Sequence, residues 1–144
     1  MILQKDQIQD IVQRLEFIKL QLADLGKFAS LTWQVYRTDR DTQRNIERLV
    51  ENVANAAIDI CKIVLAGEDV EMPNSYKEII IKLGEIKVLD EKKAEKIADY
   101  AGLRNILAHQ YLDIKWEKIK AFIQNAGDDF EEFIKEINKK IKSA

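Results

Sequence analysis

The sequence predicts an all-α fold, an antiparallel bundle of about five to six helices. Apolar residues recur at spacings of three and four along most of the chain, which is the pattern of amphipathic helices. Hydrophobic residues make up 47% of the 144 residues, while five glycines and one proline are too few for the turns of a β fold. Because no repeat, linker or low-complexity tract divides the chain, we expect one domain over residues 1–144.

The first two helices are defined by their apolar stripes. The first is expected over residues 8–27, and a link that holds Trp33 and Tyr36 follows it. Thr38 or Asp41 is expected to cap the second helix, because either side chain can accept a hydrogen bond from a free backbone amide. The residues that this second helix turns inward are Ile46, Leu49, Val50, Val53, Ala57, Ile60 and Val64.

Glycines and capping residues set the next boundaries. Gly67 is the expected C′ residue that ends the second helix. Ser75 and Glu78 have the spacing of a capping box, which starts a short third helix that stops at Gly84. Asp90 caps a fourth helix that continues into the segment GLRNILAHQY.

Two further helices are expected after that segment. One spans about residues 115–124, and Gly127 ends it. Asp128 and Glu131 then resemble the start of a last helix. That helix ends in lysines, which suit the negative end of a helix dipole: Lys139, Lys140 and Lys142.

Charge and composition exclude several function classes. The formal net charge of −2 and pI near 5.6 argue against broad capture of nucleic acid, so any RNA contact must be local. The only cysteine, Cys61, lies in an apolar stretch, which indicates a core residue and a reducing compartment. No apolar run approaches the roughly 20 residues that cross a bilayer, and no signal peptide is recognisable, so we expect a cytoplasmic protein without membrane contact. Histidine and cysteine are too scarce for a zinc site and no phosphate-binding loop is present, so we expect neither metal nor cofactor.

One segment concentrates side chains suited to catalysis. Arg104, Asn105, His109 and Tyr111 place a guanidinium, an amide, the only imidazole and a phenol within two helical turns. Imidazole exchanges protons near neutral pH, and the guanidinium fork matches phosphate oxygens. RNA carries its own nucleophile, so His109 would deprotonate a 2′-hydroxyl or protonate the leaving oxygen, giving a 2′,3′-cyclic phosphate. Arg104 would stabilise the charge of the transition state, and Asn105 would orient His109 or bind the substrate.

Helix geometry limits how these groups meet. At about 100° per residue, Arg104 lies about 140° around the helix from His109. The Arg104 side chain would have to wrap round, the helix would have to end near Ala108, or a second subunit would have to bring its own copy across a twofold axis. We favour the second subunit, because a shared cleft also supplies two histidines, one for each proton transfer.

The same residues also have structural interpretations. An arginine and a histidine on one helix are often a surface charge and a capping or core imidazole, and Tyr111 alone indicates a core or interface aromatic. Arg37, Arg40, Arg44 and Arg48 recur at three and four. This ridge would follow RNA phosphates, although such a pattern more often marks a solvated face interleaved with acidic residues.

The pattern Arg104-Asn105-xxx-His109-x-Tyr111 resembles the RxxxxH and RxxxxHxY signatures of HEPN ribonucleases. The likeness is closest to the HepT toxins within that family and runs from the first helix to at least Trp116. Other positions that carry it are Asp59 in RNIERLVENVANAAIDICKIV, Pro73 and Tyr76 in the PNSY turn, and Asp113 at the end of LRNILAHQYLDI.

This resemblance implies a homodimeric HEPN-type bundle that acts as a metal-independent endoribonuclease toxin. Arg104 and His109 would be the essential pair, in a cleft at the dimer interface. The resemblance also implies an antitoxin, an MntA-like nucleotidyltransferase that inactivates the toxin by AMPylation of the motif tyrosine, here Tyr111. Nucleotides attached there would add bulk and negative charge beside His109 and repel an RNA phosphate.

Two other functions stay open. In the first, the chain is a non-catalytic helical subunit that binds a nucleotide or a partner for a nucleotidyltransferase, and Arg104 and His109 hold a phosphate. Toxicity of the wild type and rescue by His109→Ala separate the nuclease from this subunit. Alternatively, the motif stabilises a dimer through buried hydrogen bonds, and His109→Ala should then lower the melting temperature.

Overall fold

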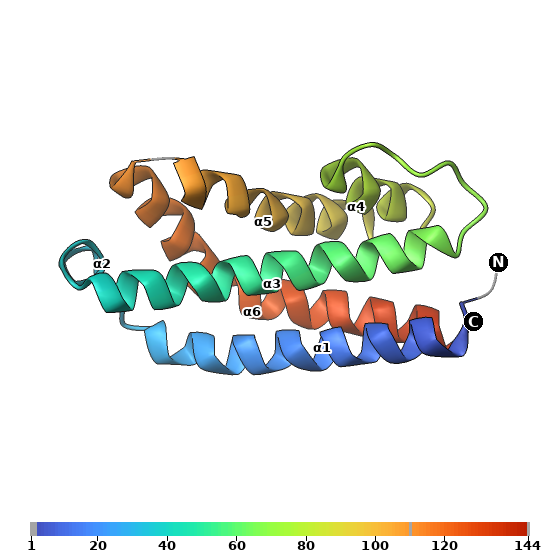
Figure 1. Ribbon diagram of the computed structural model, residues 1–144, viewed down its shortest axis with the longest axis horizontal. Helices are drawn as coiled ribbons and strands as arrows, with labels where there is room; N and C mark the ends of the chain where they lie inside the picture. Colours follow the sequence, from blue (N-terminus) through green and yellow to red (C-terminus); the bar gives the residue numbers. More distant parts are fainter. Residues whose placement is uncertain (1–2, 110, 144) are drawn as a thin grey trace.

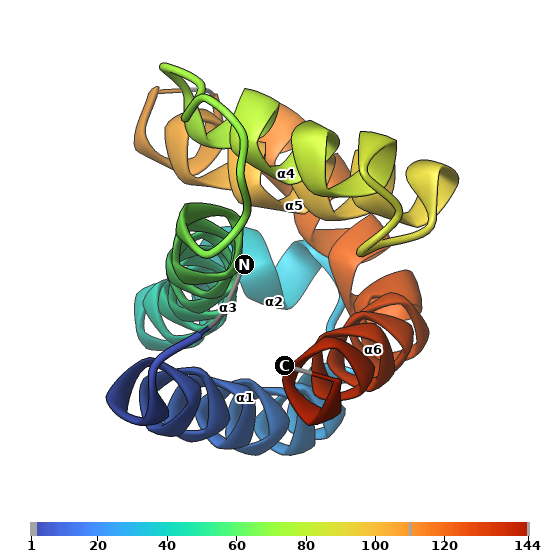
Figure 2. The ribbon, with the colours of Figure 1, turned by 90° about the vertical axis from the view of Figure 1, so that its right-hand side faces the viewer.

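A computed structural model describes residues 3–109 and 111–143, and over these residues the regular structure is helical throughout. The elements are α1 (Lys5–Leu25), the 3-10 turn η1 (Gly26–Phe28), α2 (Trp33–Thr38), α3 (Arg40–Ala66), α4 (Tyr76–Glu85), α5 (Glu91–His109) and α6 (Leu112–Lys142). In Figures 1 and 2, α1, α3 and much of α6 run along the long axis, while α4 and α5 cover the side away from α1. The predicted all-α bundle is confirmed. None of the described helices combines the length and apolarity needed to cross a membrane.

The long helix α3 lies in the middle of the bundle and supplies much of its core. All seven residues expected to point inward from it are buried. In α1, Ile11, Leu15, Ile18 and Leu25 are buried, as the apolar stripe predicts. Burying these side chains is the main free-energy gain that holds α1, α3 and α6 together.

Two predicted caps are present and place the helices that matter for the site. The Ser75 hydroxyl accepts a hydrogen bond from the Glu78 amide at 3.2 Å, which starts α4. The Asp90 carboxylate accepts one from the Lys93 amide at 3.2 Å, which starts α5. Each cap satisfies an amide that the first helical turn leaves free.

The start of α3 differs from its prediction. Its cap is Asp39, whose carboxylate accepts from the Thr42 amide at 3.3 Å, and not Thr38 or Asp41. Thr38 is unavailable because its hydroxyl donates to the Gln34 carbonyl at 2.6 Å inside the preceding helix. Asp41 instead lies in the first turn of α3, where a negative charge suits the positive end of the helix dipole.

The link expected around Trp33 and Tyr36 is the short helix α2. The Thr32 hydroxyl caps it by accepting from the Val35 amide at 3.2 Å. Six residues are too few to show a helical period, and so short a helix depends on tertiary contacts. Tyr36 provides one such contact, because its side chain is fully buried against Trp116, with ring centres 5.3 Å apart.

Two glycines, Gly67 and Gly84, lie where other segments approach the backbone closely. Gly67 ends α3 as expected, but in a right-handed conformation (φ −81°) rather than as a left-handed C′ residue. A Cβ at Gly67 would lie 2.8 Å from a Leu3 methyl carbon, so a larger residue there would require the Leu3 side chain to shift. Gly84 is inside α4, which continues to Glu85, and a Cβ there would lie 2.9 Å from the Ala94 Cβ. This close approach fixes α4 against α5.

The two helices predicted after residue 112 are one. Gly127 lies within α6, which is continuous for 31 residues, although Figure 1 shows it changing direction along its length. A glycine in a helix costs only about 1 kcal/mol relative to alanine, so the burial of Phe122, Ala126, Phe130 and Phe133 on both sides outweighs it. These residues keep spacings of four and three through Gly127.

The buried thiol of Cys61 is expected to lower the stability of the fold at alkaline pH. Cys61 is fully buried in α3, and this burial raises the pKa of its thiol. A raised folded-state pKa gives stability that is complete below the unfolded-state value near 8.5 and is lost as pH rises above it. Between pH 8 and pH 10 we expect the free energy of unfolding to fall by about 2 kcal/mol from this group.

Urea titrations followed by circular dichroism at several pH values would measure this loss. The matched variant Cys61→Ala has no thiol to ionise, so its midpoint should change much less over the same pH interval. Parallel slopes for the two proteins would contradict the assignment to Cys61.

Candidate functional site

The helix α5 carries most of the candidate residues along its C-terminal half. Arg104 and Asn105 lie in its interior, and His109 is its last residue. Gln110 lies outside the described residues, and Tyr111 is the N-cap of α6. Tyr111 is 82% exposed, so it is not a core aromatic, and the hydroxyl is open to a partner.

The Arg104 side chain is held by residues from two other helices. Its guanidinium donates a hydrogen bond to the Asn55 side-chain oxygen on α3 at 2.8 Å. The central carbon of the same guanidinium lies 5.0 Å from the centre of the Tyr76 ring on α4, a cation–π contact. Arg104 is half-buried, and no ion pair to it is recorded among the described residues.

Asn105 and Tyr76 form a second link between α5 and α4. The Asn105 amide donates to the Tyr76 hydroxyl at 3.5 Å, near the upper limit for a hydrogen bond. Tyr76 therefore contacts two consecutive residues of the motif: its ring lies against Arg104, and its hydroxyl accepts the hydrogen bond from Asn105. The predicted role of Asn105 in orienting His109 stays a prediction.

His109 and Arg104 point in different directions from one helix. Five residues separate them, which in a regular helix places their Cα atoms about 9 Å apart and about 140° around the axis. α5 ends at His109, one residue after Ala108, which agrees with the expected alternative of a helix end near Ala108. The imidazole is exposed, and Arg104 turns toward α3 and α4.

A polar and aromatic cluster joins α2 and α3 to the first turns of α6. The Tyr36 hydroxyl donates to the Glu47 carboxylate at 2.7 Å, and Lys115 on α6 pairs with the same carboxylate at 3.6 Å. Burial, together with the hydrogen bond to Glu47, raises the pKa of Tyr36 well above its usual range. The tilted rings of Trp33 and Trp116, with centres 6.3 Å apart, complete this cluster.

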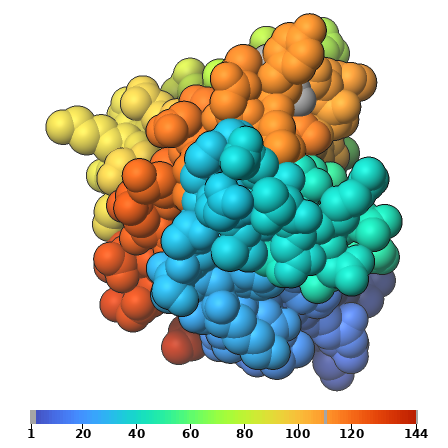
Figure 3. Space-filling model, turned by 90° about the vertical axis from the view of Figure 1, so that its left-hand side faces the viewer, coloured from blue at the N-terminus to red at the C-terminus, as the bar shows by residue number. Residues whose placement is uncertain are grey.

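The predicted arginine ridge is divided between two helices. Arg37 lies on α2, beside the Trp33 ring, and Arg40, Arg44 and Arg48 lie on α3. Figure 3 shows α2 and the start of α3 on one end of the bundle, directly below the end of α5 and the start of α6. The region where α5 ends at His109 and α6 begins at Leu112 is called the α5–α6 corner. All four arginines are exposed. The helices that carry the ridge therefore lie at the same end of the bundle as the motif, and the contact of the arginines with RNA stays a prediction.

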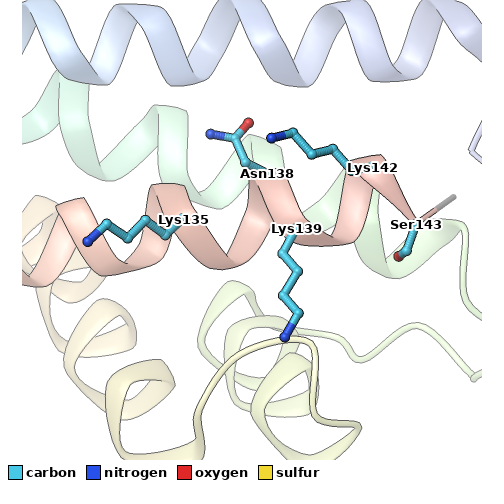
Figure 4. Close-up of a pocket in the computed structure, with 5 residues that line it drawn as sticks. All are labelled: Lys135, Asn138, Lys139, Lys142 and Ser143. Carbon is cyan, nitrogen blue, oxygen red and sulfur yellow. The ribbon is translucent and has the colours of Figure 1, made fainter.

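Two surface hollows differ in their relation to the motif. The C-terminal turns of α6 line a hollow of about 510 Å³ with Lys135, Asn138, Lys139, Lys142 and Ser143 (Figure 4). It lies at the end of the bundle opposite the α5–α6 corner (Figure 1), and its lysines suit the helix dipole. The second hollow, of about 310 Å³ between α1 and α3, includes the Arg104 partner Asn55, which lines it together with Asn52. No group of three potential metal ligands occurs within the described part of the chain.

Asn55 is the site residue that sequence analysis missed. It lies 49 positions from Arg104, and only the fold brings them together. The available signal was weak: asparagine is a poor helix former, and Asn52 and Asn55 stand in the middle of the long amphipathic helix α3. Tyr76 was marked only through resemblance, without a role.

Comparison with known proteins identifies relatives of this fold. A family model described as "Ribonuclease HepT-like" matches residues 18–137. The chain is 33% identical over 130 residues to the tRNA nuclease HepT of Aphanizomenon flos-aquae, covering 89% of this chain and 87% of that protein. It is 22% identical over 99 residues to the mRNA nuclease HepT of Shewanella oneidensis, covering 69% and 74% respectively. A tri-AMPylated Shewanella oneidensis HEPN toxin, solved in complex with an MNT antitoxin, matches with a TM-score of 0.79 and 20% identity over 90% of this chain and 97% of that one.

Proposed function

Because the chain belongs to the HepT-like ribonuclease family, we propose that it is a metal-independent endoribonuclease toxin that uses His109 and Arg104. The observation that carries this proposal is the arrangement around Arg104. Its guanidinium is anchored on the surface by two uncharged side chains, with the exposed imidazole of His109 on the same helix. Charge and proton transfer are the two functions that RNA cleavage requires.

The proposed reaction needs no group beyond the RNA and these side chains. A histidine takes the proton of a 2′-hydroxyl, and this oxygen forms a bond to the adjacent phosphorus. The bond from phosphorus to the 5′-oxygen breaks, and that oxygen receives a proton from a second imidazole or from water. Arg104 stabilises the negative charge on the phosphoryl oxygens in the transition state. The products are a 2′,3′-cyclic phosphate and a 5′-hydroxyl.

A homodimer would complete the site. Within one chain Arg104 turns toward α3 and α4, whereas His109 lies at the end of α5. A twofold axis near the α5–α6 corner would place the two motifs opposite each other, so that one shared cleft contains two arginines and two histidines. The exposed Tyr111 and Ile114 beside this corner supply surface for such a contact.

Transfer RNA is the proposed substrate class, because the 33% identical relative is a tRNA nuclease. The test is incubation of the purified protein with transfer RNA and with total RNA in EDTA, followed by mapping of the product ends. We expect cleavage with 2′,3′-cyclic phosphate ends, and none at a site that carries a 2′-deoxy substitution. Failure to cut either RNA pool, by protein free of AMP on Tyr111, would contradict the nuclease and favour the non-catalytic subunit.

An MNT-type nucleotidyltransferase is the proposed antitoxin, with Tyr111 as the acceptor of AMP. The related toxin in complex with an MNT antitoxin is tri-AMPylated, and the Tyr111 side chain is 82% exposed. We expect Tyr111→Phe to abolish AMP transfer, because the acceptor oxygen is gone.

Intact-mass spectrometry after incubation with the nucleotidyltransferase and ATP measures this transfer. Tyr100→Phe is the matched control, since Tyr100 is partly buried and its hydroxyl donates to Asp129. Two results would show that Tyr111 is not the acceptor: AMP is still added to Tyr111→Phe, or AMP transfer is lost only in Tyr100→Phe.

A further inference from the structure

We propose that Asn55 and Tyr76 are positioning residues for the reaction, which hold the Arg104 guanidinium where it can bind the scissile phosphate. This inference rests on the proposed ribonuclease function and adds residues from α3 and α4 to the site on α5. It concerns how the arginine is prepared for the substrate, and neither residue is assigned contact with RNA.

The two contacts fix the guanidinium at two points. Asn55 accepts a hydrogen bond from one terminal nitrogen at 2.8 Å, and the central carbon of the guanidinium lies over the Tyr76 ring, 5.0 Å from its centre. An unrestrained arginine has several rotatable bonds, and ordering it on binding costs free energy. Arg104 is already ordered, so less of the binding free energy of the phosphate is lost in orienting it.

Both anchors are uncharged, and this matters for an arginine that must bind a phosphate. A guanidinium has five N–H donors, of which Asn55 uses one, and the contact with Tyr76 is made through its ring. Donors therefore remain for a bidentate contact with phosphate oxygens. A carboxylate at the position of Asn55 would neutralise Arg104 and compete with the substrate.

Tyr76 is itself fixed by its surroundings. It is the first residue of α4, next to the Ser75 cap, and its hydroxyl accepts the bond from Asn105. The close approach of Gly84 to Ala94 holds α4 against α5. These contacts hold the ring beside the Arg104 guanidinium, so α4 supports the motif.

A purely structural role predicts a different result from a positioning role. Asn52 serves for comparison, because it lies one turn before Asn55, lines the same hollow and donates to Gln21 on α1 at 3.3 Å. It has no recorded contact with Arg104 among the described residues. Asparagine-to-aspartate substitution at each position is nearly isosteric, so the two variants differ mainly in which partner receives the new charge.

The experiment measures kcat and KM for transfer RNA cleavage, together with the melting temperature, in the full chain. Asn55→Asp should lower kcat/KM about 10-fold or more, without a lower melting temperature, because it forms an ion pair with Arg104. Tyr76→Leu should lower kcat/KM about 3- to 30-fold by removing the cation–π contact. Tyr76→Phe keeps the ring and should stay within about threefold of wild type, as should Asn52→Asp.

Three results would overturn the proposal. The first is wild-type kinetics in folded Asn55→Asp and Tyr76→Leu. The second is an equal loss in Asn52→Asp and Asn55→Asp that follows the melting temperature. The third is a loss in Tyr76→Phe as large as in Tyr76→Leu. A wild-type protein that cuts no RNA contradicts the proposed function instead, and the affinity of the same variants for a 2′-deoxy oligonucleotide then decides the positioning role.

Discussion

Replacing His109 by alanine is expected to slow the cleavage of transfer RNA by about 10³-fold, because general acid–base catalysis contributes roughly 10² to 10⁴. His109 is the only histidine, so no other imidazole can take over the proton transfer. The side chain is exposed at the end of α5, so the fold should be unaffected. Single-turnover cleavage in EDTA, with the melting temperature measured in parallel, checks both expectations.

The control for this variant is Gln124→Ala, which removes another exposed polar side chain from α6, 13 residues after Tyr111. It should cleave at the wild-type rate. If His109→Ala cleaves as fast as this control, the imidazole takes no part in the reaction and the ribonuclease mechanism fails. If His109→Ala instead melts at a much lower temperature, the motif is structural.

Replacing Arg104 by alanine is expected to lower kcat by about 10²- to 10³-fold, the usual effect of removing one group that stabilises transition-state charge. Arg104→Lys is the matched variant, because it keeps the charge and loses the planar fork. It should fall between the wild type and Arg104→Ala. Equal rates for Arg104→Lys and the wild type would show that charge alone is sufficient.

Mixing these inactive variants tests whether the cleft is shared. A dimer of one Arg104→Ala chain and one His109→Ala chain retains an arginine and a histidine on different subunits. If the reaction joins groups across the twofold axis, mixing after partial denaturation should restore measurable cleavage. No recovery in verified mixed dimers would place the pair within one chain or require both histidines.

Local sequence signals were sufficient where a single side chain determines a boundary. Ser75 and Asp90 were predicted as caps, and each accepts the expected backbone hydrogen bond. Apolar periodicity likewise identified the buried face of α3. These features depend on residues three or four positions apart, so they can be recognised without knowledge of the fold.

Predictions failed where a distant contact outweighed the local preference. Gly127 indicated a helix end, but burial of the flanking aromatic residues carries α6 through it. Gly84 predicts the end of α4 to within one residue, since α4 ends at Glu85, but the close approach of Ala94 is not visible in the sequence. Asn55 gave little sign of a role, because its partner Arg104 lies 49 residues away. The motif could be found from sequence, but the residues that hold it required the structure.

The position of Tyr111 at the start of α6 has a consequence for how the proposed control would work. An N-cap lies at the positive end of a helix dipole, where negative groups are tolerated or favourable by about 0.3 to 1 kcal/mol. Phosphates attached to this exposed tyrosine would therefore add no penalty to folding. The modified chain would stay fully folded and would be inactive only because the nucleotides block the site. Removal of the nucleotides would then restore activity without refolding or new synthesis.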